Sequence, residues 1–440
     1  MEYFEINGGK KLRGEITVNG SKNAAVVLLM ASLINRGKTT LKNVPQIEEV
    51  NRLIEVMESI GVQFEKNGKN LTIIPPTKIA IERINKEAAE RTRSIILMIG
   101  ALAGKIKNFL IPQAGGCRLG SRTIKPHLFA LENFGMNIVA QDRGFKITRE
   151  KLMPAKKIVL YEAGDTATEN AIMVAAQIKG KTTIKLASAN YMVQDLCFFL
   201  EELGVKIKGI GTMTLEIEGV SDIKKDVAYE ISEDPIEAMF FISAAVSTGS
   251  ELLIKRCPID FLELELLKLA KMGLRYKIVK EYSAKNKRTN LIDLRVYPSK
   301  LKALEEKIHP AAPSSAGINI DNLPFFVPVA IFAKGETFIH DWVYENRAVY
   351  FAELNRLGAK ITLMDSHRVM VEGPTKLTGA TMTCPPALRP GAIILVAMLA
   401  AKGKSVLNDI YHIESGYENL VERLRSLGAD IKKVKDDCKK

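Results

Sequence analysis

The feature of this 440-residue sequence that most constrains its fold is a two-part segment that occurs six times. In its second part, an amphipathic helix pattern runs into a glycine and then into an alternating strand pattern. Five of the six glycines fit a helix that ends at a residue in the left-handed conformation, which glycine adopts with the least strain. A single such step arises by chance in many α/β chains, but six in the same order indicate a repeated unit. The six glycines are Gly61, Gly135, Gly204, Gly273, Gly358 and Gly428.

The first part of each segment is a more apolar helix pattern that ends in a small-residue or glycine turn before another strand. These apolar stretches begin near residues 23, 94, 170, 238, 325 and 392. Each repeat is therefore predicted to be strand, helix, strand, helix, strand, and the glycine spacing makes it about 70 residues long. A unit of that size cannot bury its own apolar helix, so three repeats are expected to share one core. The fold class is thus an α/β protein of two domains with three repeats each.

One step between repeats is longer than the others. From Gly273 to Gly358 the chain runs 85 residues, and this stretch contains the Pro-, Ala- and Ser-rich segment 309–320. Such a composition is typical of a loop, so we expect an inserted loop there. The boundary between the third and fourth repeats is expected near residues 220 to 232.

Composition indicates a soluble globular protein, with 47% hydrophobic and 26% charged residues. The N-terminus lacks the pattern of a secretion signal, and the longest apolar runs, from Ala24 and from Ala392, are shorter than the roughly 18 residues that span a bilayer. We therefore expect a cytoplasmic protein with no membrane partner. The five cysteines show neither paired nor zinc-ligand spacing, as expected where thiols stay reduced.

The formal net charge of +13 is compatible with nucleic acid, an anionic surface or small phosphorylated substrates. No nucleic-acid-binding motif accompanies the lysines, and part of the excess lies in the basic segment 432–440, so no nucleic-acid partner is expected. Carboxylates and histidines lack metal-ligand spacing, so neither a metal nor a cofactor is expected. The sequence does not indicate an oligomeric state.

The six-repeat plan, which opens with GSKNAA at residues 20–25, resembles the enolpyruvyl transferases over nearly the whole chain. That family folds as two inside-out α/β barrels joined by a hinge, and the resemblance implies one domain at 22–229 and a second at 1–21 with 230–440. The segment AGGCRLGSR at 114–122 is similar to the cysteine-bearing loop of the branch that acts on UDP-N-acetylglucosamine. The shikimate-phosphate branch lacks that loop and usually reads GSKS, so we favour the first branch.

Three shorter segments extend this resemblance, namely residues 345–347, 388–389 and 410–418. The implied reaction transfers the enolpyruvyl group of phosphoenolpyruvate to a hydroxyl of UDP-N-acetylglucosamine with release of phosphate, a step in peptidoglycan precursor synthesis. Phosphoenolpyruvate carries a phosphate and a carboxylate, and the planar fork of arginine can bind either anion with two hydrogen bonds. By resemblance, Asn23 holds the acceptor sugar, and the cations of the site are Lys22, Arg93, Arg122, Arg347 and Arg389.

Addition to the enol ether requires one group that delivers a proton to the methylene carbon and another that removes a proton from the acceptor hydroxyl. The resemblance assigns the acid role to Cys117, which has two glycines before it and arginines at 118 and 122. We choose Asp321 as the base because it lies 26 positions before Arg347, which is the spacing of the family's base. The alternative is that Asp321 caps the helix predicted to begin at Leu323.

Several positions depart from the family pattern. Ser415 and Ala387 replace an arginine and an acidic residue, and Glu48 stands where the cell-wall enzymes have a lysine. On the nucleotide side, Thr123–Pro126 and Tyr161–Asn170 both differ from the usual segments. We interpret the chain as a divergent paralogue. Two alternatives stay open: enolpyruvyl transfer to a different nucleotide or nucleoside acceptor, or a ligand-binding relative without catalysis.

Overall fold

The six apolar stretches form helices that are buried along nearly their whole length in the computed structural model, which describes residues 2–113, 115, 123–311 and 317–435. In the first helix, all nine residues from Ala24 to Ser32 are buried. A helix that is apolar on every side needs protein neighbours on every side. The helices are α1 (Lys22–Ser32), η2 (Arg93–Ile96) continued by α4 (Leu97–Leu102), α6 (Asp165–Ala176), α8 (Pro235–Ser247), η4 (Leu323–Phe325) continued by α10 (Phe326–Ile331), and α11 (Leu388–Ala400).

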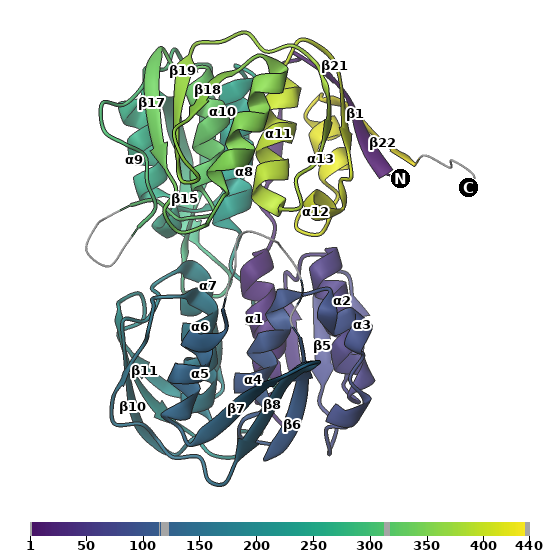
Figure 1. Cartoon of the computed structure of the whole chain (residues 1–440), viewed down its shortest axis with the longest axis vertical. Helices are drawn as coiled ribbons and strands as arrows, with labels where there is room; N and C mark the ends of the chain where they lie inside the picture. The colour runs from purple at the N-terminus through teal and green to yellow at the C-terminus, as the bar shows by residue number, and fades with distance from the viewer. Residues whose placement is uncertain (1, 114, 116–122, 312–316, 436–440) are drawn as a thin grey trace. The chain divides into compact units, whose positions relative to one another are not determined.

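The chain forms two compact units, and each contains three of these helices (Figure 1). Among the described residues, the N-terminal unit holds 20–113, 115 and 123–232, and the C-terminal unit holds 2–19, 233–311 and 317–435. Within the N-terminal unit α4 contacts both α1 and α6, and within the C-terminal unit α8, α10 and α11 contact one another. Each unit therefore buries three apolar helices against one another, as the repeat pattern predicts.

All six repeat glycines adopt a positive φ, from 84° at Gly135 to 103° at Gly273. This left-handed conformation lets the chain reverse from the second helix of each repeat into the next strand. The prediction made for five of the glycines thus holds for all six. The second helices are α2 (Glu48–Ser59), α5 (Lys125–Glu132), α7 (Tyr191–Glu202), α9 (Glu263–Lys271), η5 (Ala348–Leu357) and α13 (Leu420–Ser426), and the short helices are η1 (Ile81–Arg83), α3 (Lys86–Glu90), η3 (Ile259–Phe261) and α12 (Tyr411–Glu414).

The described strands of the N-terminal unit form three sheets, ordered β13-β3-β5-β4, β6-β8-β7 and β11-β12-β10-β9. In the third sheet, β10 pairs in parallel with β9 and antiparallel with β12, and β12 forms a hairpin with the preceding strand β11. The strands are β3 (Thr39–Lys42), β4 (Gln63–Asn67), β5 (Asn70–Ile74), β6 (Asn108–Pro112), β7 (Met136–Gln141), β8 (Gly144–Arg149), β9 (Ile158–Val159), β10 (Gly180–Lys185), β11 (Lys206–Lys208), β12 (Thr214–Gly219) and β13 (Val227–Glu230).

The C-terminal unit repeats this plan, with described sheets ordered β15-β16-β14-β2, β17-β19-β18 and β20-β21-β1-β22. The sequence outline predicted one strand after the second helix of each repeat, whereas five of the six repeats have a hairpin of two strands there. The strands are β1 (Glu2–Gly8), β2 (Glu15–Thr17), β14 (Leu252–Pro258), β15 (Arg275–Ser283), β16 (Asn290–Tyr297), β17 (Gly335–His340), β18 (Lys360–Leu363), β19 (Arg368–Gly373), β20 (Thr381–Thr383), β21 (Gly403–Asn408) and β22 (Asp430–Lys435).

The sixth repeat obtains its last strand from the other end of the chain. Strand β1 lies antiparallel between β21 and β22, so the N-terminal strand in purple joins the C-terminal strands in yellow (Figure 1). Strand β2 likewise adds in parallel to β14. The first residues of the chain therefore complete the C-terminal unit before the chain enters the N-terminal unit.

The long step between Gly273 and Gly358 is only partly a loop. Strands β15 and β16 have 9 and 8 residues, whereas the corresponding β18 and β19 have 4 and 6, so part of the extra length extends this hairpin. Within the predicted loop 309–320, residues 312–316 lie outside the described part of the chain.

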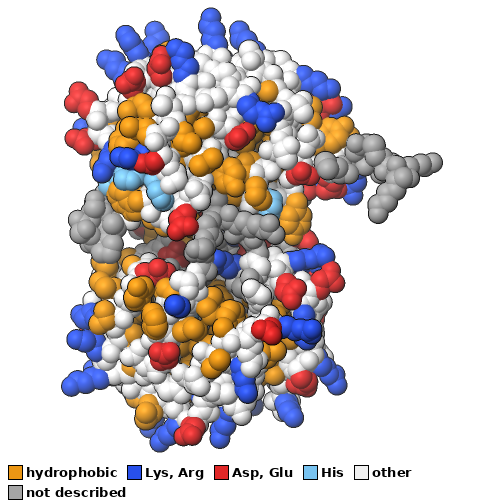
Figure 2. All heavy atoms as spheres, in the orientation of Figure 1, with side chains coloured by type: hydrophobic (Ala, Val, Ile, Leu, Met, Phe, Trp, Pro, Cys, Tyr) orange, Lys and Arg blue, Asp and Glu red, His pale blue; other side chains and the backbone are white. Residues whose placement is uncertain are grey.

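On the face drawn in Figure 2, lysine and arginine side chains are scattered and interspersed with acidic ones. In the described part of the chain, no helix has both the length and the apolar character needed to cross a membrane.

Candidate functional site

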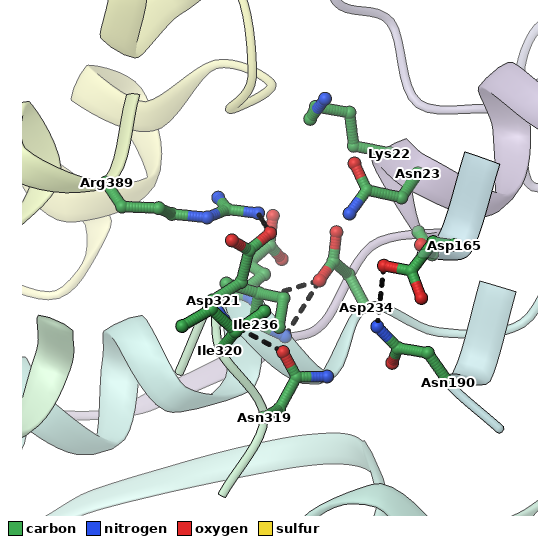
Figure 3. A network of polar contacts seen from close by, with 12 residues as sticks. Lys22, Asn23, Asp165, Asn190, Asp234, Ile236, Asn319, Ile320, Asp321 and Arg389 are labelled. Carbon is green, nitrogen blue, oxygen red and sulfur yellow. Dashed lines mark hydrogen bonds and ion pairs between the residues drawn. The ribbon is translucent and has the colours of Figure 1, made fainter. Parts of the chain in front are cut away.

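Charged or amide side chains lie at the start of every apolar helix, and most of those predicted from the sequence are among them. In the N-terminal unit, Lys22 and Asn23 open α1, Arg93 opens η2 and Asp165 opens α6. In the C-terminal unit, Asp234 caps α8, Asp321 lies just before η4 and Arg389 is in the first turn of α11. Figure 3 draws most of these side chains.

Asp321 is bound by the two arginines that the sequence assigns to the same unit. Its Oδ2 accepts a hydrogen bond from Arg389 Nη2 at 3.2 Å, which Figure 3 shows, and its Oδ1 lies 3.9 Å from Arg347 Nη1. The side chain is 20% exposed. Helix η4 has no side-chain cap, so the alternative role of Asp321 as a helix cap does not describe this geometry. The structure therefore brings Asp321, Arg347 and Arg389 together.

Arg347 has no exposed surface, and its guanidinium is held on several sides. Its Nε forms an ion pair with Asp341 Oδ2, and its Nη2 donates to the carbonyl of Ile320 at 2.8 Å. The guanidinium also lies 4.4 Å from the centre of the Tyr344 ring. The sequence reasoning missed Asp341, although an aspartate directly after the alternating strand β17 and close to the Glu345–Arg347 motif was a usable signal.

Arg389 is similarly restrained. Its Nη1 donates to Tyr417 Oη at 3.3 Å, and its guanidinium carbon lies 5.9 Å from the centre of that ring. Burial raises the pKa of Tyr417, and the nearby positive charge of Arg389 only partly opposes this rise. Tyr417 therefore stays a neutral hydroxyl at neutral pH and accepts the hydrogen bond.

Two residues of the C-terminal unit, Ala387 and Ser415, depart from the family pattern, and the structure shows what each of them contacts. Ala387 is fully buried at the start of α11, where it makes no side-chain cap. Ser415 Oγ donates to the carbonyl of His412 at 2.8 Å, so it bonds to its own helical turn. Neither residue supplies the charge that the family pattern has at its position.

Lys22 is held in place by an acidic residue that the sequence reasoning passed over. Its Nζ lies 2.6 Å from Glu49 Oε2, while Glu49 Oε1 accepts hydrogen bonds from Ser94 Oγ at 2.8 Å and Thr92 Oγ1 at 3.3 Å. Burial by itself raises the pKa of Glu49, but the Lys22 charge and these hydrogen bonds outweigh burial and hold the pKa below its ordinary value. The signal for Glu49 was its place beside Glu48 at the start of an amphipathic helix.

Glu48, the predicted charge reversal, is matched within its own helix. Arg52 lies one helical turn further along α2, and its Nη2 is 2.5 Å from Glu48 Oε1. The same arginine binds Glu55 through Nη1 at 2.7 Å. Glu48 therefore shares the positive charge of Arg52 with Glu55 on the surface of α2.

Arg93 lies near a buried neutral histidine. The Asn170 side-chain oxygen accepts from Gly100, so its Nδ2 donates to His127 Nδ1 at 3.0 Å. The ring proton must then be on Nε2, which bonds Thr166 Oγ1 at 3.3 Å. Burial, with a further contribution from the positive charge of Arg93, lowers the pKa of His127 to about 4.

The predicted acceptor residue Asn23 donates from Nδ2 to Tyr191 Oη at 3.1 Å. In the altered segment Tyr161–Asn170, Asp165 accepts from Ser188 Oγ at 2.5 Å and from Asn190 Nδ2 at 3.1 Å, a bond drawn in Figure 3. Burial, reinforced by the Asp165 charge, raises the pKa of Glu169 well above its ordinary value. The carboxylate at the start of α6 is thus bound to the segment just before α7.

Two predicted residues, Cys117 and Arg122, lie outside the described residues. Three other cysteines, Cys197, Cys257 and Cys384, are buried free thiols whose pKa is raised chiefly by burial, to about 12 for Cys384. Their thiols therefore stay protonated, as suits structural residues. Among the described residues, no three His, Cys, Asp or Glu side chains gather in a way that could hold a metal ion.

Solved structures confirm the fold. The enolpyruvyl transferase NikO from Streptomyces tendae superposes with a TM-score of 0.83 at 24% identity, over 98% of this chain and 99% of that one. The EPSP synthase of Acinetobacter baumannii gives a TM-score of 0.75 at 18% identity, over 99% and 100% of the two chains. The chain therefore has the mixed α/β fold of these enzymes.

Sequence comparison extends the likeness to the whole chain. The family model described as EPSP synthase (3-phosphoshikimate 1-carboxyvinyltransferase) matches residues 6–424. The UDP-N-acetylglucosamine 1-carboxyvinyltransferase 3 of Caldanaerobacter subterraneus subsp. tengcongensis is 34% identical over 99% of this chain and 100% of its own length. The Treponema denticola UDP-N-acetylglucosamine 1-carboxyvinyltransferase is 33% identical over 98% and 99%. The chain therefore belongs to the EPSP synthase family of transferases, as a relative of the UDP-N-acetylglucosamine 1-carboxyvinyltransferases.

Proposed function

We propose that this protein transfers the enolpyruvyl group of phosphoenolpyruvate to a hydroxyl of UDP-N-acetylglucosamine and releases phosphate. The full-length relatives that carry this activity in their names support the choice of substrates. The observation that carries the proposal is the placement of Asp321 between Arg389 and Arg347. A carboxylate beside two cations suits a site that binds an anionic substrate and removes a proton next to it.

The reaction needs a proton at one carbon and the loss of a proton from one oxygen. The acceptor oxygen adds to the substituted carbon of phosphoenolpyruvate while the methylene carbon gains a proton. Phosphate then leaves the substituted carbon as the former methylene carbon loses a proton. In our assignment Asp321 takes the hydroxyl proton and Cys117 delivers the proton to carbon. Asn23 binds the acceptor, and the anions of phosphoenolpyruvate are bound by Lys22, Arg93, Arg122, Arg347 and Arg389.

The finer architecture belongs to the same proposal. Three buried helices and three sheets in each unit support two inside-out α/β barrels. We assign one domain to residues 22–229 and the other to 1–21 with 230–440. Enzymes that bind phosphoenolpyruvate and a nucleotide sugar draw both from the cytoplasm, which stays the predicted location.

One observation favours a second acceptor class. In the segment where the resemblance implies diphosphate binding, the start of α6 carries the Asp165 carboxylate, which opposes a diphosphate at that point. A nucleotide or nucleoside acceptor with a different phosphate position would avoid this repulsion. The full-length relatives favour UDP-N-acetylglucosamine over this alternative.

Phosphate release from phosphoenolpyruvate tests both possibilities. Release with UDP-N-acetylglucosamine is the expected result, release only with other nucleotides would establish the second acceptor class, and no release with a broad acceptor panel would refute catalysis. We expect Cys117→Ser and Asp321→Asn each to lower kcat by about 10²- to 10⁴-fold with a smaller change in KM. Asp365→Asn, which changes an exposed carboxylate of the C-terminal unit, is the matched control and should keep the parent rate.

A further inference from the structure

A buried carboxylate on helix α9 accepts hydrogen bonds from the turn that carries Asp321. Glu265 interrupts the apolar face of this helix and is only 3% exposed. Its Oε1 accepts hydrogen bonds from the backbone N–H of Asn319 at 3.0 Å and from Asn322 Nδ2 at 2.9 Å. Burying a carboxylate is unfavourable unless it makes such bonds, and both partners lie in one four-residue turn.

The turn itself is closed by Asn319. Its carbonyl accepts from the backbone N–H groups of Asn322 at 3.0 Å and Leu323 at 3.1 Å. Its side-chain oxygen accepts from the backbone N–H of Asp321 at 2.9 Å, a bond drawn in Figure 3. Glu265 therefore binds the backbone of the turn before Asp321, at Asn319, and the side chain that follows Asp321, at Asn322.

A second group binds the same turn at a different atom. Arg347 Nη2 donates to the carbonyl of Ile320, the residue just before Asp321. The turn is therefore fixed through Asn319, Ile320 and Asn322, and the Asp321 carboxylate points to Arg389.

We propose that Glu265 is a positioning residue for the transfer reaction: it holds the turn 319–322 so that the Asp321 carboxylate keeps its place beside Arg389. The inference rests on the proposed function in one respect, since it takes Asp321 as the base. The hydrogen bonds that Glu265 accepts from Asn319 and Asn322 need only an acceptor oxygen, so its negative charge is not required for them. A glutamine, which keeps such an oxygen, should therefore replace it.

Three variants separate positioning from simple stability. Glu265→Leu fills the buried space without an acceptor, Glu265→Gln keeps the acceptor, and Glu263→Gln changes an exposed glutamate of the same helix as a control. Hydrogen exchange measured by mass spectrometry on a peptide covering residues 318–323 reports on the turn without any need for turnover. Kinetics of phosphate release, in the parent and in an Asp321→Asn background, report on the role of the turn in catalysis.

We expect Glu265→Leu to speed exchange in the 318–323 peptide at least tenfold and to lower kcat by about 10- to 100-fold with little change in the KM for phosphoenolpyruvate. Glu265→Gln should restore both values to near the parent. In the Asp321→Asn background, Glu265→Leu should lower kcat no further.

Three results would overturn the proposal: unchanged exchange in Glu265→Leu, unchanged kcat despite faster exchange, or an equal further loss of kcat in the Asp321→Asn background. A parent protein without turnover would refute the proposed function instead. The exchange measurement would then still decide whether Glu265 holds the turn.

Discussion

The two units hold their charged residues in different ways. In the C-terminal unit, Arg347 and Asp341 form an ion pair in which neither side chain is exposed. In the N-terminal unit, Lys22 and Glu49 are 14% and 22% exposed, and His127 is held by neutral hydrogen bonds. When one partner of a fully buried ion pair is removed, water cannot solvate the remaining charge, whereas it can do so at a partly exposed pair. The C-terminal unit should therefore be the more sensitive to loss of one charge.

The largest expected effect comes from breaking the buried pair. Asp341→Asn removes the nearer of the two carboxylates at the buried Arg347 guanidinium and leaves Asp321 at 3.9 Å, so it should reduce the free energy of unfolding by about 3 kcal/mol or more. Urea unfolding followed by circular dichroism measures the change. Asp365→Asn, at an exposed pair with Arg368 in the same unit, is the control and should leave the midpoint nearly unchanged. Equal midpoints for the two variants would contradict the contrast between the units.

The next effect concerns the neutral histidine of the N-terminal unit. The pKa of His127 is about 4 in the folded protein and near 6.5 when unfolded, so between these values the unfolded chain binds more protons. Stability from this group is present above about pH 6.5 and is lost as the pH falls toward 4, by about 3 kcal/mol in total.

Other buried groups also titrate in this pH range, so the variant His127→Gln is needed to isolate the contribution of His127 to the pH dependence of the unfolding free energy. Unfolding free energies from urea titrations at several pH values between 4 and 7 should fall less steeply in the variant than in the parent. Parallel curves would show that His127 becomes protonated in the folded protein at its ordinary pKa.

The smallest effect is expected at the partly exposed pair. Glu49→Gln removes the counter-charge of Lys22 and keeps only one of the two acceptor oxygens that bind Lys22 and Ser94, so the free energy of unfolding should fall by about 1 to 2 kcal/mol. Glu48→Gln, next to it on α2, loses only a helical pair with Arg52, worth about 0.3 to 0.5 kcal/mol. If Glu49→Gln destabilised as strongly as Asp341→Asn, exposure would not be what separates the two units.

The sequence was sufficient to predict those features that are determined by residues close together in the chain. The six glycines at helix ends, the six apolar helices and the grouping in repeats follow from local periodicity and from the ease with which glycine adopts a positive φ. The resemblance also placed Asp321, Arg347 and Arg389 in one site, and the structure brings them together.

Other features depended on contacts between distant residues. Strand β1 pairs with β22 at the far end of the chain, which no local pattern could indicate. The partners Asp341, Glu49 and Glu265 were missed because an acidic residue on a helix or at a strand end looks the same in sequence whether it faces solvent or a buried cation. Burial turns such a carboxylate into a fixed partner for a charge or an amide, and only the tertiary structure of each unit decides which carboxylates are buried.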